Sequence, residues 1–432
     1  MEGQDLRVFF NSSNPSRTLD MGNPDDRKYY INFSSVRGSE MIGELGRTIK
    51  LSDENTCQLF TGHMGCGKST ELLRLKADLK NDGFHVVYFE SDKYLDVTDI
   101  DISDILLAIA RQVSESLQRI KIVLRANYFA NLFHEITEFL QTPLEIETAE
   151  LSVGIAKITA EAKESPVLRY QLREILEPRT TNLLESINHD ILERATAKLK
   201  EQGSKGLVVL VDNLDRVEAR SVHSEKNLQE YLFIDRGAQL RRLNCHIVYT
   251  IPLALTFSSH IETLSNYLQD PKRLPMIPVK FRDGSNYQES IFLLSQMVLA
   301  RAFPNLNETQ RIERITEVFD VPETLVRLCQ ISGGHARSLL RLLYHCLQMQ
   351  DPPISRKCLE NAIITRREQL RTIPQESGWN LLHQVSQQKW LGSVQAEELS
   401  LLRDQLVFEY RDAQGYWFDI NPILAEAQEM RT

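Results

Sequence analysis

Residues 62–69 read Gly-His-Met-Gly-Cys-Gly-Lys-Ser, and this stretch decides the fold. It fits the pattern G-x-x-x-x-G-K-[ST] of a phosphate-binding P-loop. Glycines in such a loop let backbone N–H groups turn inward toward phosphate oxygens, beside a helix N-terminus that favours negative charge. The short apolar run of residues 58–61 before the motif predicts a strand, and the spacing of apolar residues in 70–76 after it predicts a helix. These flanks predict a nucleoside triphosphate site rather than a glycine turn with a solvated lysine.

The chemistry of such a loop assigns roles to its residues. Lys68 is expected to reach the β- and γ-phosphates, and the Ser69 hydroxyl is expected to ligate Mg²⁺. The expected cofactors are therefore ATP or ADP with Mg²⁺. The candidate nucleotide-binding residues are Gly62, His63, Met64, Gly65, Cys66, Gly67, Lys68, Ser69 and Thr70, together with Arg37 and Gly38.

A strand that ends in an acidic residue is the partner that a P-loop requires. The apolar residues 206–211 are followed by Asp212-Asn213-Leu214-Asp215-Arg216. Asp212 is our candidate for the carboxylate that orients Mg²⁺, and Asp215 for the general base or the group that positions water. The alternative for Asp215 is a capped loop in which it pairs with Arg216. Because Asn213 stands where a catalytic glutamate usually follows, we expect slow turnover.

Three further polar residues are candidates for the site. Thr250 ends an apolar strand, where it would act as a γ-phosphate sensor or as a simple strand end. Arg337 follows Gly333-Gly334 at a predicted helix start, and its guanidinium would bind the γ-phosphate or form a surface ion pair. Arg273 precedes the last predicted core strand, where it would act as an arginine finger on a neighbouring subunit or have no such role.

The order of elements predicts an α/β fold. Apolar runs at 85–89, 206–211, 246–250 and 274–279 alternate with helical patterns, which indicates a mostly parallel sheet covered on both faces. Ligands of such sheets bind at the carboxyl ends of the strands, where the P-loop, Asp212 and Thr250 fall. Helical patterns then run from 287 to 372. Two short helices and a hairpin at 406–420 with a Gly-containing turn predict a winged helix.

Four segments follow from this pattern. They are a flexible N-terminal segment at 1–29, a P-loop ATPase core at 30–283 with a helical insertion at 92–205, a helical lid at 284–373 and a winged-helix domain at 374–432. Within the core and its insertion we expect helices at 41–49, 102–120, 126–140 and 169–200, and a short hairpin at 144–158. The insertion is either a partner-binding surface or additional packing over the core.

Composition excludes some functions. The chain has 432 residues and a net charge of −9, which argues against affinity for nucleic acid or anionic lipid over its whole surface. It has no apolar run of membrane-spanning length and no signal-peptide core, so we expect a cytoplasmic protein without a membrane partner. The six cysteines show neither C-x-x-C pairs nor zinc spacing and are expected to be buried free thiols.

With these motifs in order, the chain resembles the AAA+-like branch of P-loop ATPases, and within it the STAND-type signalling ATPases. Residues 212–216 also resemble the Asp-x-Leu-Asp-Arg Walker B of the KAP group. The resemblance implies an ATP/ADP-driven conformational switch that assembles in the ATP state, often in bacterial antiviral defence or regulation. It also implies a lid and a winged helix that fold over the nucleotide. STAND proteins usually carry an effector and a repeat sensor on the same chain, and we recognise neither. We therefore expect self-association and a separately encoded effector or sensor.

Two rival functions are weighed against this switch. A DNA-engaging ATPase of the origin-recognition or transposition-regulator type also joins such a core to a winged helix. From residue 376 onward, however, the sequence has nine acidic residues and only four basic ones. A domain that binds DNA phosphates needs Lys and Arg. The basic cluster of Arg366, Arg367 and Arg371 keeps DNA contact as the less favoured alternative. A small-molecule kinase would not explain the lid and the winged helix.

Overall fold

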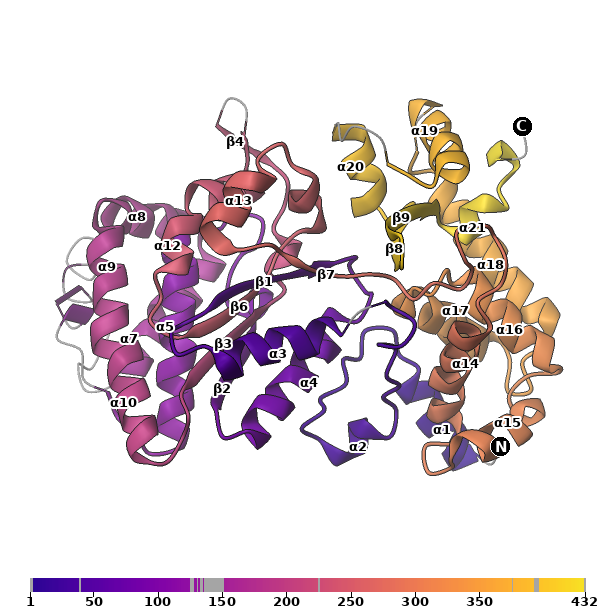
Figure 1. The fold of residues 1–432 in the computed structure, drawn as a ribbon, viewed down its shortest axis with the longest axis horizontal. Coiled ribbons are helices and arrows are strands. Elements are labelled where there is room, and N and C mark those ends of the chain that lie inside the picture. The colour runs from indigo at the N-terminus through magenta and orange to yellow at the C-terminus, as the bar shows by residue number, and fades with distance from the viewer. Residues whose placement is uncertain are drawn as a thin grey trace. The chain divides into compact units, whose positions relative to one another are not determined.

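The fold is described from a computed structural model of the chain. The structure describes residues 3–430 except 39, 125–127, 130, 133–134, 136–150, 224–225, 375 and 392–395. The chain forms two compact units (Figure 1), and each is described by itself. Unit 1 comprises Met1–Met41, Gly62–Arg74 and Arg273–Thr432. Unit 2 comprises Ile42–Thr61 and Leu75–Lys272.

A five-stranded sheet forms the centre of the α/β fold. Its strands are β1 (Cys57–Gly62), β2 (His85–Glu90), β3 (Leu207–Asp212), β6 (His246–Thr250) and β7 (Lys272–Leu274). The strand order is β2-β3-β6-β1-β7 (Figure 1). β2 pairs with β3, β3 with β6 and β6 with β1, all in parallel. All six residues of β3 are buried, as expected for a continuous run of Val and Leu in a sheet covered on both faces. The predicted parallel α/β sheet is confirmed.

The strand register brings polar residues to one edge of the sheet. Glu90 on β2 is opposite Asp212 on β3, and Phe60 on β1 is opposite Thr250 on β6. Because these strands are parallel, β3 and β6 present Asp212 and Thr250 at their carboxyl ends. β1 reaches the same edge and continues along the chain into residues 62–69.

The last core strand is shorter than predicted. We expected it at 274–279, but β7 ends at Leu274. Pro275 and Pro278 have no N–H to donate to a neighbouring strand, so the segment leaves the sheet. The N–H of Met276, between these prolines, donates instead to the Glu409 carbonyl at 2.9 Å.

Helices of the insertion share one apolar core with the sheet. Leu59, Val209 and Ile247 of the strands join residues of every helical part of the insertion in this core. The helices from the chain's first core element onward are α3 (Met41–Leu51), α4 (Lys68–Asn81), α5 (Ile102–Arg119), α7 (Leu151–Glu164), α8 (Pro166–Leu176), α9 (Thr180–Ser186), α10 (Arg194–Glu201), α11 (Leu228–Glu230), α12 (Gly237–Arg241) and α13 (Ile261–Leu268). Single turns include η1 (Ser91–Lys93), η2 (Glu177–Arg179) and η4 (Leu214–Arg216), and Ile187–Glu193 and Tyr231–Asp235 are π-helical. A small ladder joins β4 (Ser221–His223) to β5 (Lys226–Asn227).

Two predictions for the insertion were wrong. The hairpin expected at 144–158 is instead helix α7 from Leu151 onward, and residues 144–150 lie outside the described residues. Ile155, Ile158 and Ala162 are buried at a helical spacing, which outweighs the alternation read from the sequence. The single helix expected at 169–200 is a succession of helices, with a 3₁₀ turn at Glu177–Arg179 where Pro178 lies. The helix expected at 126–140 lies largely outside the described residues.

The remaining helices belong to unit 1. They are α1 (Gly3–Ser12), α2 (Pro24–Arg27), α14 (Gln288–Ala302), α15 (Glu308–Glu313), α16 (Pro322–Ile331), α17 (Ala336–Met349), α18 (Arg356–Arg371), α19 (Glu376–Gln388), α20 (Ala396–Arg403) and α21 (Pro422–Ala425). α14, α16, α17 and α18 pack together (Figure 1). β8 (Val407–Asp412) and β9 (Gly415–Ile420) form the predicted C-terminal hairpin.

The N-terminal segment is not a flexible lead-in. Residues 3–12 form α1, which packs on α14. Phe9 is fully buried, and the Phe10 ring lies 4.4 Å from that of Tyr344. The Arg301 Nε donates to the Ser12 carbonyl at 3.1 Å. The apolar residues of this short segment therefore become part of the core of unit 1, in spite of the polar residues around them.

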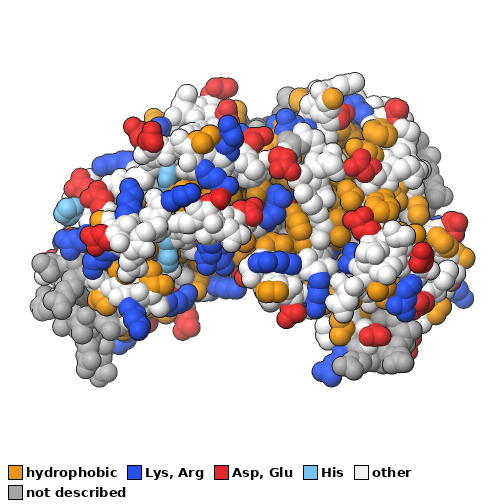
Figure 2. All heavy atoms as spheres, turned by 60° about the horizontal axis from the view of Figure 1, so that its bottom comes forward, with side chains coloured by type: hydrophobic (Ala, Val, Ile, Leu, Met, Phe, Trp, Pro, Cys, Tyr) orange, Lys and Arg blue, Asp and Glu red, His pale blue; other side chains and the backbone are white. Residues whose placement is uncertain are grey.

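The surface and the cysteines agree with the composition. Acidic and basic side chains are interspersed on the face shown in Figure 2. All six cysteines are free and buried, as predicted. Among the described residues, no helix is long and apolar enough to cross a membrane.

Candidate nucleotide-binding site

The segment Gly62–Ser69 forms a tight loop between β1 and α4. Gly62, Gly65 and Gly67 have φ angles of 153°, 87° and 109°, which side-chain-bearing residues rarely adopt. A Cβ on Gly62 would lie 2.6 Å from the Leu274 carbonyl oxygen. The backbone conformation of the loop therefore requires glycine at these positions. Ser69 and Thr70 follow in the first turn of α4.

Lys68 is folded back over its own loop. Its Nζ donates to the carbonyls of Gly62 and His63 at 2.8 and 2.9 Å, and the residue is buried. An ammonium in this position adds positive charge to a glycine-rich loop at a helix N-terminus, where anions are favoured. The loop therefore fits the phosphates that the sequence predicts.

Arg37 lies against the loop in the same unit. Its Nη2 donates to the Cys66 carbonyl at 2.7 Å. The side chain is buried, and its Nε makes no hydrogen bond among the described residues. Arg37 therefore brings a second cation to the loop, with a donor still to be satisfied. Gly38 is exposed and has a φ of 72°.

Two side chains from distant parts of the sequence bind the Met64 carbonyl. His335 Nε2 and Gln405 Nε2 each donate to it at 2.8 Å. The Ser338 hydroxyl donates to Nδ1 of His335 at 2.6 Å, which fixes the Nε2–H tautomer. Burial lowers the pKa of His335 to about 3, although its bond to Met64 opposes this shift.

His63 of the loop contacts the C-terminal hairpin. Its Nε2 accepts a hydrogen bond from the Glu409 N–H at 2.8 Å, so a neutral His63 carries its proton on Nδ1. Burial, together with the charges of His335 and Lys68, lowers the pKa of His63 to about 3. His63 therefore serves as a neutral link between the loop and β8 rather than as a cation for phosphate.

Arg337 lies directly beside the loop. Its backbone N–H donates to the Gly65 carbonyl at 3.3 Å, and its Cβ would lie 2.9 Å from a Cβ built on Gly65. The preceding Gly333-Gly334 pair permits this approach, with φ angles of 60° and 70°. A Cβ on Gly334 would lie only 1.7 Å from the Ile277 carbonyl oxygen. Arg337 thus lies against the loop, and its role as a sensor of the γ-phosphate stays a prediction.

Arg273 is held by the hairpin of its own chain. Its Nη1 lies 3.0 Å from the Glu409 carboxylate, and its guanidinium lies 3.6 Å from the centre of the Tyr416 ring. Glu409 is buried, and burial raises its pKa to about 7 although Arg273 opposes this shift. A role of Arg273 on a neighbouring subunit stays a prediction, and would require release of this pair.

Asp212 ends β3 in unit 2 with both carboxylate oxygens oriented by neighbours. Oδ1 accepts from the Asn213 N–H at 2.8 Å, and Oδ2 accepts from the Tyr88 hydroxyl at 2.8 Å. The residue is buried. Such hydrogen bonds fix a carboxylate before it meets a metal ion, in the manner of residues that orient metal ligands.

The turn after Asp212 is stabilised from η1, the single turn that follows β2. Asn213 is left-handed, with a φ of 65°. Its Nδ2 donates to Asp92 Oδ1 at 2.8 Å, and Arg216 Nη1 lies 2.5 Å from Asp92 Oδ2. The cation beside Asp215 is therefore paired with Asp92, a residue that the sequence pattern did not single out. Asp215 lies half-buried within the same turn.

The Thr250 hydroxyl forms its hydrogen bonds within unit 2. It is fully buried, and its hydroxyl accepts from the Leu214 N–H at 3.1 Å and donates to the Val211 carbonyl at 3.4 Å. These contacts favour the strand-end alternative over the sensor. They also tie the end of β6 to the turn that follows Asp212.

The structure thus places the predicted residues in two groups. Unit 1 brings Arg37 and Arg337 to the loop, and unit 2 brings Thr250 to the turn that carries Asp212 and Asp215. Sequence reasoning missed His335, Gln405 and Glu409 in the first group and Asp92 and Tyr88 in the second. Only His335 stood within a motif that we had singled out, at Gly333–Arg337.

Residues 39–233 match the family model described as the KAP family P-loop domain. The matched range includes both the loop at 62–69 and the turn at 212–216. With the parallel sheet and the loop geometry, this match defines a P-loop NTPase fold. Comparison with curated proteins finds no match.

Solved structures with similar folds are also found. The chain has 13% identity and a TM-score of 0.42 to the Walker-type ATPase PABY2304 of Pyrococcus abyssi, over 98% of this chain and 100% of that chain. It has 12% identity and a TM-score of 0.38 to the Aeropyrum pernix ORC1 protein in complex with DNA, over 90% and 92%. It has 11% identity and a TM-score of 0.40 to the Aeropyrum pernix ORC2 protein in ADPNP-ADP complexes. This match covers 98% of this chain and 95% of that chain. Because these values are low, we infer nothing about function from these similarities.

Proposed function

We propose that this protein binds ATP or ADP with Mg²⁺, hydrolyses ATP slowly and acts as a nucleotide-driven conformational switch. One observation carries the proposal. Within unit 1, the first half of the P-loop is contacted by residues of two later parts of the chain, the start of α17 and the segment from Gln405 to Glu409. A change in the loop on nucleotide binding must therefore alter these contacts.

The contacts have a direction that suits a switch. His335 and Gln405 donate to the Met64 carbonyl, and His63 accepts from the Glu409 N–H. In all three hydrogen bonds the P-loop therefore supplies the acceptor, a carbonyl or an imidazole. Backbone N–H groups are the donors that such loops offer to phosphate. Both sets of bonds depend on the same short loop, so phosphate and the later segments are coupled through its conformation.

The chain's own residues would divide the chemistry as follows. The loop and Lys68 hold the phosphates, Ser69 ligates Mg²⁺, and Arg337 reports the γ-phosphate. Asp212 orients the metal, and Asp215 positions the attacking water. The bound Mg²⁺ neutralises phosphate charge as it builds during transfer. Asn213 in place of a glutamate supports slow turnover, as in a switch that depends on binding.

The remaining parts of the proposal concern assembly. Helices α14 to α18 act as the lid, and α19, α20 and the hairpin act as a winged helix that faces protein. ATP binding promotes self-association, and the output passes to a separately encoded effector or sensor in the cytoplasm, in bacterial antiviral defence or another regulatory pathway. The acidic balance of residues 376–432 supports a protein-facing role.

The basic cluster on α18 gives little support to the DNA-engaging alternative. Arg367 pairs with Glu426 at 2.5 Å, and Arg371 pairs with Glu429 at 2.6 Å. Burial lowers the pKa of Arg366, which lies close to Arg341. Arg367 and Arg371 therefore stabilise the C-terminal segment, and two of the three charges are already neutralised.

Size measurement with and without nucleotide tests the proposal. The protein is measured with ADP, ATP and a non-hydrolysable ATP analogue, each with and without double-stranded DNA. We expect a larger species with the analogue alone, and no such species for Lys68→Ala. Assembly only with DNA would favour the DNA-engaging alternative, and a persistent monomer with fast turnover would exclude the switch.

Hydrogen exchange supplies a second readout inside unit 1. The amide of Glu409 donates to His63 and should exchange faster when nucleotide alters the loop. Peptides from α14, which packs on α1 and α16, serve as an internal control. Unchanged exchange at residues 405–412 with saturating nucleotide would contradict coupling through this bond.

A further inference from the structure

The loop between β2 and α5 contacts the inserted helices α7 and α8 and also the turn after Asp212. This loop, residues 91–101, contains Asp92, Asp96 and Asp99 and ends at Asp101, the N-cap of α5. The loop, α7, α8 and the turn after Asp212 all belong to unit 2. It is short and crowded with acidic residues, so its position depends on the cations that neutralise them.

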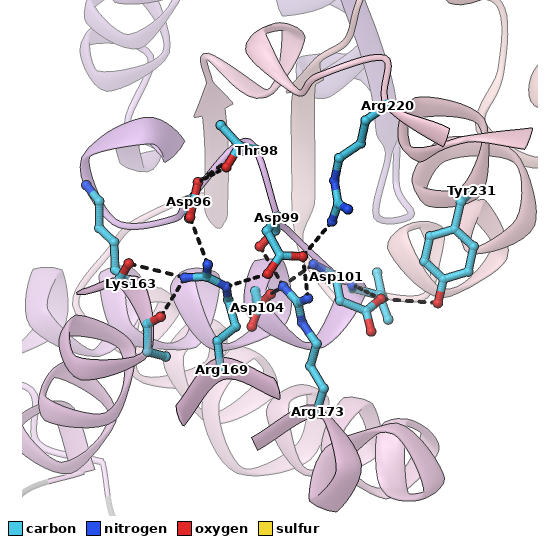
Figure 3. Close-up of polar contacts among 12 residues, drawn as sticks. Asp96, Thr98, Asp99, Asp101, Asp104, Lys163, Arg169, Arg173, Arg220 and Tyr231 are labelled. Atoms are coloured by element: carbon cyan, nitrogen blue, oxygen red, sulfur yellow. Dashed lines mark hydrogen bonds and ion pairs between the residues drawn. The ribbon is translucent and has the colours of Figure 1, made fainter. Parts of the chain in front are cut away.

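Two arginines of the inserted helix α8 bind this loop, and we call them the arginine clamp. Arg169 donates to Asp96 at 2.8 Å and to Asp99 at 2.9 Å. Arg173 donates to the Asp99 carboxylate at 2.8 Å, to its carbonyl at 2.6 Å and to Asp104 at 2.7 Å. Figure 3 shows both side chains reaching from α8 into the acidic loop, with Arg220 approaching Asp99 from the other side.

Arg169 of the clamp is buried, and Arg173 is half-buried. Arg169 is 4% exposed. Burial opposes ionisation of Asp99, but hydrogen bonds from Arg173 and Arg169 outweigh it and lower the pKa of Asp99. Removing one partner from such a set leaves a buried charge uncompensated, so the loop and α8 move as one body.

The other end of the loop holds the turn after β3. Asp92 accepts from the Asn213 side chain and from Arg216 at 2.8 and 2.5 Å. Its own carbonyl accepts from Lys163 of α7 at 2.8 Å. Lys163, whose own carbonyl accepts from Arg169 of the clamp at 3.2 Å, therefore fixes Asp92 on its backbone side, and Asp92 fixes the turn with its carboxylate.

Asn213 passes this constraint to Asp212. A left-handed conformation costs a non-glycine residue on the order of 1 kcal/mol, so it persists only where neighbours impose it. Asp92 supplies one such contact, and the Asn213 N–H then donates to Asp212 Oδ1. The position of the Asp212 carboxylate thus depends on Asp92.

We propose that Asp92 is a positioning residue for Asp212, and that the arginine clamp of the insertion sets Asp92 and thereby the rate of hydrolysis. This inference rests on the proposed ATPase function. It gives the insertion a role other than covering the core. A purely structural role of Asp92 would change stability and every ligand affinity together, whereas a positioning role changes metal use and turnover.

The test compares four variants by turnover, ADP affinity and the Mg²⁺ concentration for half-maximal rate. Asp92→Ala should lower turnover about tenfold and raise the Mg²⁺ requirement several-fold, with ADP affinity within twofold. Asp92→Asn keeps an oxygen acceptor for Asn213 and should recover most of the turnover. Arg169→Gln should shift turnover in the same direction as Asp92→Ala. Asp82→Ala removes a surface pair with Lys50 in the same unit and should behave as wild type.

A double variant and a metal probe complete the design. If Asp92 acts through Asn213, Asp92→Ala combined with Asn213→Ala should be no slower than the slower single variant. Mn²⁺ binding in the presence of ADP, measured by electron paramagnetic resonance, reports on the metal site at Asp212 without requiring hydrolysis.

Wild-type turnover and Mn²⁺ affinity in Asp92→Ala would overturn the inference, as would additive effects in the double variant. If Asp92→Ala does not fold, turnover, ADP affinity and Mg²⁺ requirement are compared for Asn213→Ala and Arg169→Gln instead. Wild-type values in both variants would then overturn the inference. Absence of hydrolysis in the wild type would instead contradict the proposed function and leave the Mn²⁺ comparison to decide this one.

Discussion

The imidazole of His63 accepts a hydrogen bond from the backbone N–H of Glu409, a residue 346 positions later in the chain. The donor is a peptide group and cannot give way to an acceptor, so this bond exists only while Nε2 of His63 is unprotonated. Glu409 in turn carries the buried carboxylate that pairs with Arg273. Protonation of either residue therefore acts on the link between the P-loop and the hairpin.

Acid should destabilise the protein through His63 and His335, which are both buried. His63 and His335 have pKa values near 3, below the ordinary 6.5, so the unfolded chain binds protons that the folded chain does not. Stability present above pH 6.5 is then lost as the pH falls, by about 2 kcal/mol per histidine between pH 7 and pH 5. Urea unfolding of wild type and His335→Gln at both pH values measures this, and an equal loss in the two proteins would contradict it.

Glu409 should act in the opposite direction. Its pKa of about 7 lies above the ordinary 4.5, so its contribution is fully present below pH 4.5 and is lost as the pH rises through 7. Relative to Glu409→Gln, wild type should lose about 2–3 kcal/mol of unfolding free energy between pH 5 and pH 8. Arg273→Ala serves as the control. It removes the cation that opposes the shift, so the loss should move to higher pH. A wild-type-minus-variant difference that does not change with pH would disprove this prediction.

Gly334→Ala should be far more damaging than Gly415→Ala. Both glycines have positive φ, but a Cβ on Gly334 would lie 1.7 Å from the Ile277 oxygen, whereas one on Gly415 meets nothing within 4 Å. The control variant should cost on the order of 1 kcal/mol from backbone strain, and Gly334→Ala at least about 3 kcal/mol. Thermal unfolding of the two variants checks the difference, and equal melting temperatures would refute it.

Tyr88→Phe should slow hydrolysis without weakening nucleotide binding. The Tyr88 hydroxyl donates to Asp212 Oδ2 at 2.8 Å, and a hydrogen bond to a charged group is worth about 1.5–3 kcal/mol. Turnover should therefore fall about tenfold, and Asp212→Asn should lower it further. Steady-state rates and ADP titrations of both variants test this. A weaker ADP affinity with unchanged turnover would speak against it.

The strands, most helices and the P-loop could be predicted because their information is local. Apolar runs and glycine spacing specify β3 and residues 62–69 within a few residues of sequence. The wrong predictions have two sources, a distant partner and a local signal that was misread. Residues 3–12 form a helix that packs on α14, and β7 ends early because prolines follow it.

The same reason explains what the sequence missed in the site. His335 and Gln405 meet at the Met64 carbonyl from positions 271 and 341 residues away. Asp92 reaches Asn213 across 121 residues. No motif or period records such pairs, because each residue type is also common on ordinary surfaces. Only the parallel sheet, which brings strand ends together, made Asp212 predictable.

The short edge strand β7 also limits how copies of this protein can associate. A sheet edge with free N–H groups can recruit a strand from a second molecule and build a continuous intermolecular sheet. β7 offers only Lys272–Leu274 at its edge of the sheet order, and Pro275 follows without a donor. Strand addition at this edge is therefore disfavoured, which protects the chain from aggregation there. Assembly of copies through this edge would therefore use side-chain surfaces, which can separate again when the nucleotide leaves.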